Sequence, residues 1–262
     1  MRPSHYQRLS YNIKTFYEPV FAHRELFRSF CPQSTLQNEI NALIAIESLS
    51  INVGKRFATM VILVDFADGE KELAGTWVLL THRAAKMKKH ANEISVPGGW
   101  YLFYCKEMGC AVDLCESLEK AALREVEEEI GLEREIIDVW GKLPPIKLRN
   151  SGGETTPFVA SLVGISSPAS LASKLVLQQK EVQSVFLVSL TELLAQKRFT
   201  SFRVDAPLHG GLPFYYKLPV FVVDNVIPLI PSRREEYPTK IKEIWGITAI
   251  TLHIALQCIF PR

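Results

Sequence analysis

The sequence predicts an α/β sandwich in which a mixed β-sheet lies between helices. Short apolar runs rich in β-branched residues predict strands, and one stretch with a helical apolar period predicts a long amphipathic helix. Strands and helices alternate without the regular strand–helix–strand rhythm of a parallel sheet, which favours a mixed sheet. The 262 residues, 47% hydrophobic and 22% charged, are enough for one sizeable core.

The first pair of strands is predicted from two apolar runs at residues 59–64 and 77–81. An aspartate–glycine turn signal lies between them at 68–69. A basic loop follows at 83–90, and a short strand-like run at 94–96 comes after it.

Residues 113–130 have the apolar period of an α-helix. The apolar stripe comprises Leu114, Leu118, Ala121, Ala122, Val126 and Ile130. Asp113 is the predicted N-cap, and Gly131 is expected to end the helix in a left-handed conformation.

The C-terminal half of the chain adds strands and two more helices. Strands are predicted at 158–163, 182–188 and 218–223, a short helix at 189–196, and a polar surface loop at 228–242. Residues 244–260 carry no formal charge, but the run is short for a membrane span and includes threonine, histidine and glutamine. A buried core helix is therefore predicted there.

Charge and cysteine content argue against several classes of protein. The 30 basic residues nearly balance the 28 acidic ones, so bulk charge gives no case for nucleic-acid binding. Five sparse cysteines indicate reduced thiols in an intracellular protein, and their spacing does not favour a zinc site. Residues 1–50 are predicted to be a helical N-terminal extension without the continuous apolar core of a secretory signal.

The acidic end of the long helix carries the candidate chemistry. On a helix, Glu125, Glu128 and Glu129 project from one side because positions three and four apart are neighbours, whereas Glu127 points elsewhere. Like charges at i,i+4 are unfavourable by roughly 0.2–0.5 kcal/mol per pair. A Mg²⁺ or Mn²⁺ ion would offset that cost. The glutamates alone leave a metal site and a solvated acidic face equally open.

The acidic helix is part of a longer motif. Glu116 lies eight residues before Arg124, and residues 124–132 read Arg-Glu-Val-Glu-Glu-Glu-Ile-Gly-Leu. This pattern resembles the Nudix hydrolase signature Gly-x5-Glu-x7-Arg-Glu-U-x-Glu-Glu-x-Gly-U, in which U is a bulky aliphatic residue. The resemblance implies the Nudix fold, an α/β/α sandwich with a mixed sheet, over residues 51–262.

The resemblance also implies roles for the motif residues. Glu125, Glu128 and Glu129 would bind Mg²⁺ or Mn²⁺, and Glu128 or Glu129 would also help to deprotonate the attacking water. Arg124 would orient Glu125 through a charge-assisted pair. Glu116 would support the start of the helix or an outer metal shell.

The start of the motif departs from the signature. Its opening glycine should stand six residues before Glu116, where this chain has Cys110. Without residues 100–110, Gly99 would complete the signature, and Gly98 and Gly99 would let the backbone approach metal or phosphate closely. This eleven-residue insertion is interpreted either as a lid over the site or as a stretch wrongly retained in the gene model. The second interpretation is favoured because it restores the motif at both ends.

A second pattern lies upstream of the acidic helix. Residues 79–84 (Leu-Leu-Thr-His-Arg-Ala) and 96–99 (Val-Pro-Gly-Gly) have the spacing of the coenzyme A pyrophosphatase branch of Nudix hydrolases, which they resemble. Lys88, Asn92 and Val96 stand where that branch has arginine, glycine and phenylalanine. Lysine keeps the charge but loses the planar fork suited to phosphate.

The branch resemblance implies a small-molecule substrate, without nucleic acid or a membrane span. The reaction would cleave coenzyme A or acyl-coenzyme A into phosphopantetheine and adenosine 3′,5′-bisphosphate. Arg83 and Lys88 would bind phosphate within a cluster that includes Lys86 and Lys89, for which a plain solvated loop is the alternative. Relatives of this kind are often peroxisomal or mitochondrial, but this chain has no clear signal for either compartment.

Two other functions stay open. The enzyme would act on another nucleoside diphosphate derivative if Lys88, Asn92 and Val96 reflect a different substrate. The chain would be a non-catalytic Nudix-fold binding protein if the insertion at 100–110 is real and disables the site.

Overall fold

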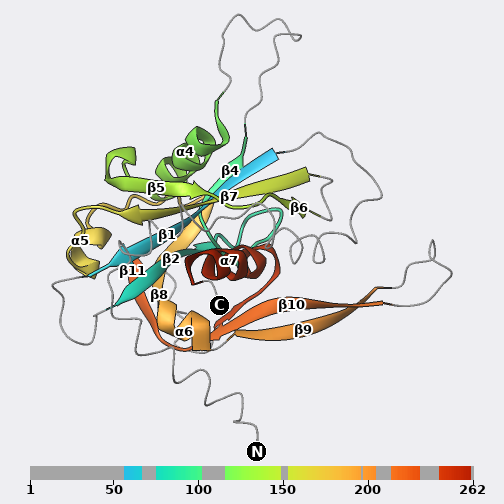
Figure 1. Ribbon diagram of the computed structural model, residues 1–262. Helices are drawn as coiled ribbons and strands as arrows, with labels where there is room; N and C mark the ends of the chain where they lie inside the picture. The colour runs from blue at the N-terminus through green and yellow to red at the C-terminus, as the bar shows by residue number, and fades with distance from the viewer. Residues whose placement is uncertain are drawn as a thin grey trace, which may run out of the picture.

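The computed structural model describes residues 56–66, 75–101, 116–148, 153–195, 197–204, 214–230 and 242–260 (Figure 1). The predicted extension at 1–50, the turn at 68–69 and most of the insertion at 100–110 lie outside these residues. In the described part, a mixed sheet lies between two layers of helices, as the sequence predicts.

The main sheet contains nine strands of the described residues, in the order β11–β8–β2–β1–β7–β5, with β3, β4 and β6 paired off this path. Its central strand, β1, runs antiparallel to β2 and parallel to β7, so the sheet is mixed. The strands are β1 (Arg56–Asp65), β2 (Thr76–Arg83), β3 (Ile94–Ser95), β4 (Gly98–Trp100), β5 (Ile137–Lys142), β6 (Ile146–Leu148), β7 (Gly153–Leu162), β8 (Val182–Ser189) and β11 (Val226–Ile230).

A smaller antiparallel sheet has the order β12–β10–β9. Its strands are β9 (Lys197–Val204), β10 (Phe214–Val223) and β12 (Lys242–Ile244). Phe221 and Val223 of β10 and Ile244 of β12 are buried in the same apolar cluster as α7, so this sheet shares the core of the main one.

Both faces of β1 are buried, which requires a helical layer on each side of the sheet. Met60 and Ile62 contribute to one apolar cluster, and Val61 and Leu63 to the other, because successive side chains of a strand point to opposite faces. The first layer contains α4 (Leu118–Ile130) and α5 (Pro168–Ala172), next to the short 3₁₀ helix η4 (Arg134–Ile136). The second contains α6 (Leu190–Ala195) and α7 (Gly246–Ile259).

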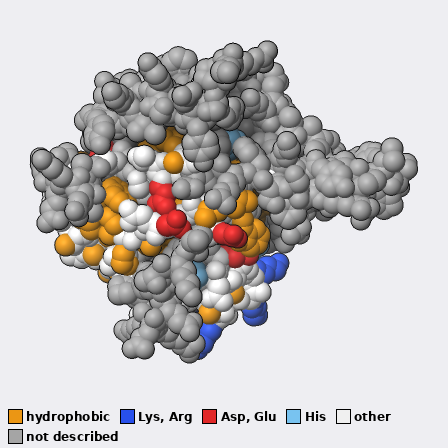
Figure 2. All heavy atoms as spheres, turned by 90° about the horizontal axis from the view of Figure 1, so that it is seen from below, with side chains coloured by type: hydrophobic (Ala, Val, Ile, Leu, Met, Phe, Trp, Pro, Cys, Tyr) orange, Lys and Arg blue, Asp and Glu red, His pale blue; other side chains and the backbone are white. Residues whose placement is uncertain are grey.

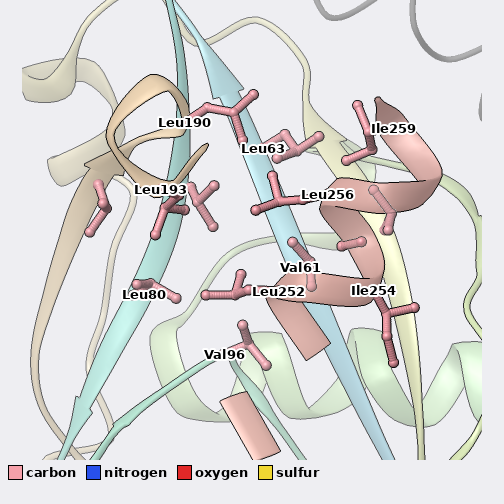
Figure 3. Packing of buried hydrophobic residues seen from close by; sticks show 14 of the residues in the cluster. Val61, Leu63, Leu80, Val96, Leu190, Leu193, Leu252, Ile254, Leu256 and Ile259 are labelled. Carbon is pink, nitrogen blue, oxygen red and sulfur yellow. The ribbon is translucent and has the colours of Figure 1, made fainter. Parts of the chain in front are cut away.

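The predicted core helix at the end of the chain is confirmed as α7. Figure 3 shows Leu252, Ile254, Leu256 and Ile259 of α7 among the side chains of β1, β2 and α6. No helix in the described part of the chain is long and apolar enough to cross a membrane. Thr248, in the first turn of α7, donates a hydrogen bond of 3.1 Å to the carbonyl of Ile94, which ties this helix to β3.

The C-terminal end of α4 agrees with the prediction, and its N-terminal end does not. Gly131 has the predicted left-handed conformation (φ 74°), and its N–H donates to the Glu127 carbonyl. The predicted start at Asp113 was wrong, because Ser117 is extended and its side chain accepts the Lys120 N–H at 3.1 Å. Ser117 therefore satisfies a free N–H of the first turn, and α4 begins one residue later.

The predicted surface loop at 228–242 also needs a correction. Pro228–Ile230 are part of β11, which is an edge strand, and residues 231–241 lie outside the described part. Proline is compatible with an edge strand, and the register of β11 against β8 shifts between Pro228 and Ile230. Strands β4, β5, β6, β9 and β12 and helix α5 were not predicted from the sequence.

Figure 2 shows the face of the molecule that points down in Figure 1. Among the coloured side chains, acidic groups lie in the middle of this face beside hydrophobic ones, and Lys and Arg lie near one margin. The described side chains visible there form no broad basic surface.

The close packing behind α4 predicts a large effect of Gly131→Ala on stability. A Cβ at Gly131 would lie 2.8 Å from the backbone N and 2.9 Å from the backbone O of Val176, on top of the roughly 1–2 kcal/mol cost of a left-handed alanine. Gly164 has a similar φ of 73° but nothing within 4 Å of such a Cβ. We expect Gly164→Ala to lower the unfolding free energy by about 1 kcal/mol and Gly131→Ala by clearly more. Urea unfolding of both variants checks this, and equal losses would contradict it.

Candidate active site

The two predicted glycines lie directly beneath the acidic helix. In the pairing of β4 with β1, Gly98 is opposite Thr59 and Gly99 is opposite Ala58. A Cβ on Gly98 (φ 151°) would collide with the Ala58 carbonyl, and one on Gly99 would overlap the carboxylate of Glu125. Gly98 therefore has to be glycine for β4 to pair with β1 in this conformation, and the missing side chain at Gly99 leaves room for the Glu125 carboxylate.

The carboxylate of Glu129 is held by the backbone of β4, which lies close to α4. The N–H of Gly98 donates a hydrogen bond of 3.1 Å to Oε2 of Glu129, whose side chain is buried with only 3% exposure. Glu125 is buried beside it at 9% exposure. Two carboxylates thus reach the interior next to the β4 backbone, which is unusual for glutamates.

Arg124 connects four groups around the site. Its Nε donates to Glu116 at 3.0 Å, and its Nη1 donates to Glu125 at 2.9 Å and to Glu128 at 3.0 Å. Its Nη2 donates to the Trp100 carbonyl at 2.8 Å. One guanidinium therefore joins the segment before α4, the acidic face of α4 and the end of β4.

The charges of these groups depend strongly on burial. Desolvation raises the pKa of Glu129 to about 8, with added repulsion from Glu125 and Glu181, although the Gly98 N–H and Arg83 lower it. Burial also raises the pKa of Glu125, against the lowering effect of Arg124. Burial disfavours the charged form of Arg124, but its hydrogen bonds to Glu116, Glu125 and Glu128 outweigh this and raise its pKa.

The donor set fits a hard divalent cation. Buried like charges at Glu125 and Glu129 are unfavourable by themselves, and a Mg²⁺ or Mn²⁺ ion would favour their ionised forms. The described residues contain no group of three acidic, histidine or cysteine side chains already arranged around one point. Glu128, with 58% of its side chain exposed and its carboxylate bonded to Arg124, would have to turn to complete such a group.

The predicted phosphate-binding residues occupy different environments. Arg83, at the end of β2, is near enough to Glu129 for its charge to lower the pKa of that carboxyl, and its Nε is buried without a hydrogen-bond partner among the described residues. Lys86, Lys88 and Lys89 are exposed on the following loop. Arg83 thus belongs to the buried site and the lysines to its surface.

Two of the three departures from the branch pattern have a structural explanation. Asn92 has φ 60°, a left-handed conformation that asparagine tolerates better than most residues, so it can replace glycine without a change of backbone. Val96 is buried at 6% exposure in the apolar cluster beneath α7, so it is a core residue in place of a larger one. Lys88 is exposed, as Asn92 is, but neither backbone conformation nor packing explains the lysine.

Glu181, in the turn before β8, was not predicted from the sequence to belong to the site. Its carbonyl accepts the Ala84 N–H at 2.8 Å, and its charge raises the pKa of both Glu125 and Glu129. Glu181 is far from the motif in sequence, and the pairing of β8 with β2 brings it there. No local pattern could have indicated it.

The chain is similar to proteins of one family. The family model described as NUDIX domain matches residues 55–206, more than half of the chain. Nudix hydrolase 3 of Caenorhabditis elegans is 29% identical over 184 residues, which cover 70% of this chain and 67% of that protein. An uncharacterized Nudix hydrolase NudL of Citrobacter koseri is 37% identical over 123 residues, which cover 47% of this chain and 54% of that protein. The NudL protein of Salmonella paratyphi B is 31% identical over 182 residues, with 69% and 74% covered. The match thus spans little more than half of the Citrobacter relative.

The raised pKa of Glu129 predicts how the stability of the metal-free protein depends on pH. The carboxyl keeps its proton up to about pH 8 when folded, but loses it near its ordinary value of 4.5 when unfolded. Between these values the folded state binds more protons, so the unfolding free energy falls as pH rises, by at most about 1.4 kcal/mol per pH unit. Urea unfolding at several pH values, without divalent cations, should show this fall. Glu129→Gln should reduce it, and an unchanged slope in that variant would contradict the assignment.

Proposed function

This chain belongs to the NUDIX domain family, and we propose that it hydrolyses the diphosphate bond of coenzyme A or an acyl-coenzyme A with the help of Mg²⁺ or Mn²⁺. The observation that carries the proposal is the pair of buried carboxylates, Glu125 and Glu129, held between the β4 glycines and Arg124. Such a pair is unfavourable without a cation, so stability alone does not account for it.

The proposed roles are those that the family resemblance implies, and the positions of the side chains are compatible with them. Glu125 and Glu129 would hold the cation from the buried side, and Glu128 would join them from solvent after release from Arg124. A bound cation would polarise the phosphate oxygens and lower the pKa of a coordinated water. Glu128 or Glu129 would accept a proton from the attacking water. Arg124, anchored by Glu116, would keep Glu125 in place.

Several cationic side chains near the glutamates support a phosphate-rich substrate. The Nε of Arg83 is buried beside Glu129 and has no hydrogen-bond partner among the described residues, so it could donate to a phosphate oxygen at the site. The exposed lysines at 86, 88 and 89 follow on the adjoining loop. Because Asn92 and Val96 have structural explanations, they do not favour a different substrate.

The proposal is tested by measuring release of adenosine 3′,5′-bisphosphate from coenzyme A with Mg²⁺ or Mn²⁺. We expect the intact chain to be active and a chelator to abolish the activity. A panel of other nucleoside diphosphate derivatives tests the alternative substrate class, and faster turnover of one of them would replace coenzyme A as the assignment.

A variant lacking residues 100–110 separates the two interpretations of the insertion. Activity of both chains would identify a tolerated loop or lid, whereas activity of the shortened chain alone would mean that the insertion disables the site. If neither folded chain turns over any diphosphate, the non-catalytic alternative replaces the proposed function.

Single substitutions on α4 provide a matched comparison within one helix. We expect Glu125→Gln, Glu128→Gln and Glu129→Gln to lower kcat by about 100-fold or more, because each removes a proposed ligand charge. Glu127→Gln is the control, because Glu127 is half exposed and pairs with Arg134 at 2.9 Å away from the site. Its loss should cost at most about 1 kcal/mol of stability and leave kcat nearly unchanged. Mn²⁺ binding, measured by calorimetry, should weaken in the same three variants and stay unchanged in Glu127→Gln. Equal effects in all four variants would contradict these roles.

A further inference from the structure

Glu181 lies in a turn whose backbone is hydrogen bonded to two parts of the candidate site. The N–H of Gln178 donates to the carbonyl of Glu129 at 3.0 Å, and the N–H of Glu181 donates to the carbonyl of Gln178 at 2.8 Å. On the other side, the Ala84 N–H donates to the carbonyl of Glu181 at 2.8 Å. The backbone of Glu181 is thus fixed between the last turn of α4 and the end of β2.

The side chain of Glu181, in contrast, can turn. Glu181 is exposed, and its carboxylate has no hydrogen-bond or ion-pair partner among the described residues. Arg83 lies opposite Val182 in the pairing of β2 with β8, yet it forms no ion pair with Glu181 in this part of the chain, and its own Nε is unpartnered. Neutralisation of this arginine therefore does not account for the glutamate.

Glu181 brings a further negative charge to the buried carboxylates from outside α4. Its charge raises the pKa of both Glu125 and Glu129, so it acts on the pair from close by. Carboxylates that repel one another in this way destabilise a fold unless a cation binds among them. Glu128 has to leave Arg124 before it can bind a cation, whereas Glu181 has no such bond to break.

We propose that Glu181 is a further ligand of the divalent cation, which it binds directly through its carboxylate from the turn before β8. This inference rests on the proposed binding of Mg²⁺ or Mn²⁺ by Glu125 and Glu129. Carboxylate oxygens are suitable ligands for either ion. A ligand from this turn would enclose the cation between the turn and α4, so the buried pair would not depend on Glu128 alone to complete the site.

Binding of Mn²⁺ to the full chain tests this inference without any need for turnover. We expect Glu181→Gln to weaken Mn²⁺ binding, measured by titration calorimetry, by about 10-fold or more, because even the partners of metal ligands contribute roughly 10–100-fold to affinity. The matched control is Glu133→Gln, which removes the same charge from an exposed residue just beyond α4. Its affinity for Mn²⁺ should stay within about twofold, because salt screens an exposed charge.

Water proton relaxation distinguishes a ligand from a nearby charge. Loss of a direct carboxylate ligand opens a coordination position on Mn²⁺ for a water molecule. The relaxation enhancement by the bound ion, measured at saturation, should therefore be larger in Glu181→Gln than in the intact chain. A charge that acts only from a distance would change the affinity but not the number of coordinated water molecules.

The outcomes separate this inference from the proposed function. Unchanged Mn²⁺ affinity in Glu181→Gln would overturn it, even if coenzyme A is hydrolysed, and so would an equal loss in Glu133→Gln. Weaker binding with unchanged hydration of the ion would also overturn it, as would absence of Mn²⁺ binding by the intact chain. Mn²⁺ binding that requires Glu181, in a chain that hydrolyses no diphosphate, would keep the ligand and remove the proposed activity. Thermal unfolding of both metal-free variants checks that they fold as the intact chain does.

Discussion

The hydrogen bonds of Arg124 hold together the parts on which the candidate site depends. One partly buried guanidinium contacts Glu116 before α4, Glu125 and Glu128 on α4, and the backbone of β4 at Trp100. A planar fork with several donors can bond these partners simultaneously, which a lysine ammonium on a flexible stem cannot do with the same geometry. The Arg124 guanidinium thus links α4, β4 and the segment before α4 through charge-assisted hydrogen bonds.

Close packing and charge act together around this centre. Because β4 carries glycine at 98 and 99, its backbone can come near enough to α4 for a peptide N–H to reach Glu129. The same approach removes water from Glu125 and Glu129 and raises the pKa of both. The fold therefore keeps two carboxylates in a state that a divalent cation would stabilise, while Arg124 compensates part of their charge.

Local patterns predicted the parts of the fold that depend on local physics. The amphipathic stripe of α4, its glycine end and the core helix α7 follow from periodicity, backbone conformation and composition, and the structure confirms them. The start of α4 was misplaced because Asp113 and Ser117 are both acceptable caps, and only the structure shows which side chain reaches a free N–H. The position of Glu181 depends on strand pairing between distant segments, which no local pattern contains.

The departures from the branch pattern show why a substitution has to be judged from its surroundings. In sequence, Lys88, Asn92 and Val96 are three equal differences from one motif. In the structure, Asn92 occupies a left-handed turn position and Val96 lies in the apolar core, so both are explained by backbone conformation and packing. Lys88 lies on the exposed loop that follows Arg83, where neither a backbone constraint nor core packing accounts for the change from arginine to lysine. Of the three differences, only the one at Lys88 would therefore bear on how a phosphate is bound, because lysine lacks the planar fork of arginine.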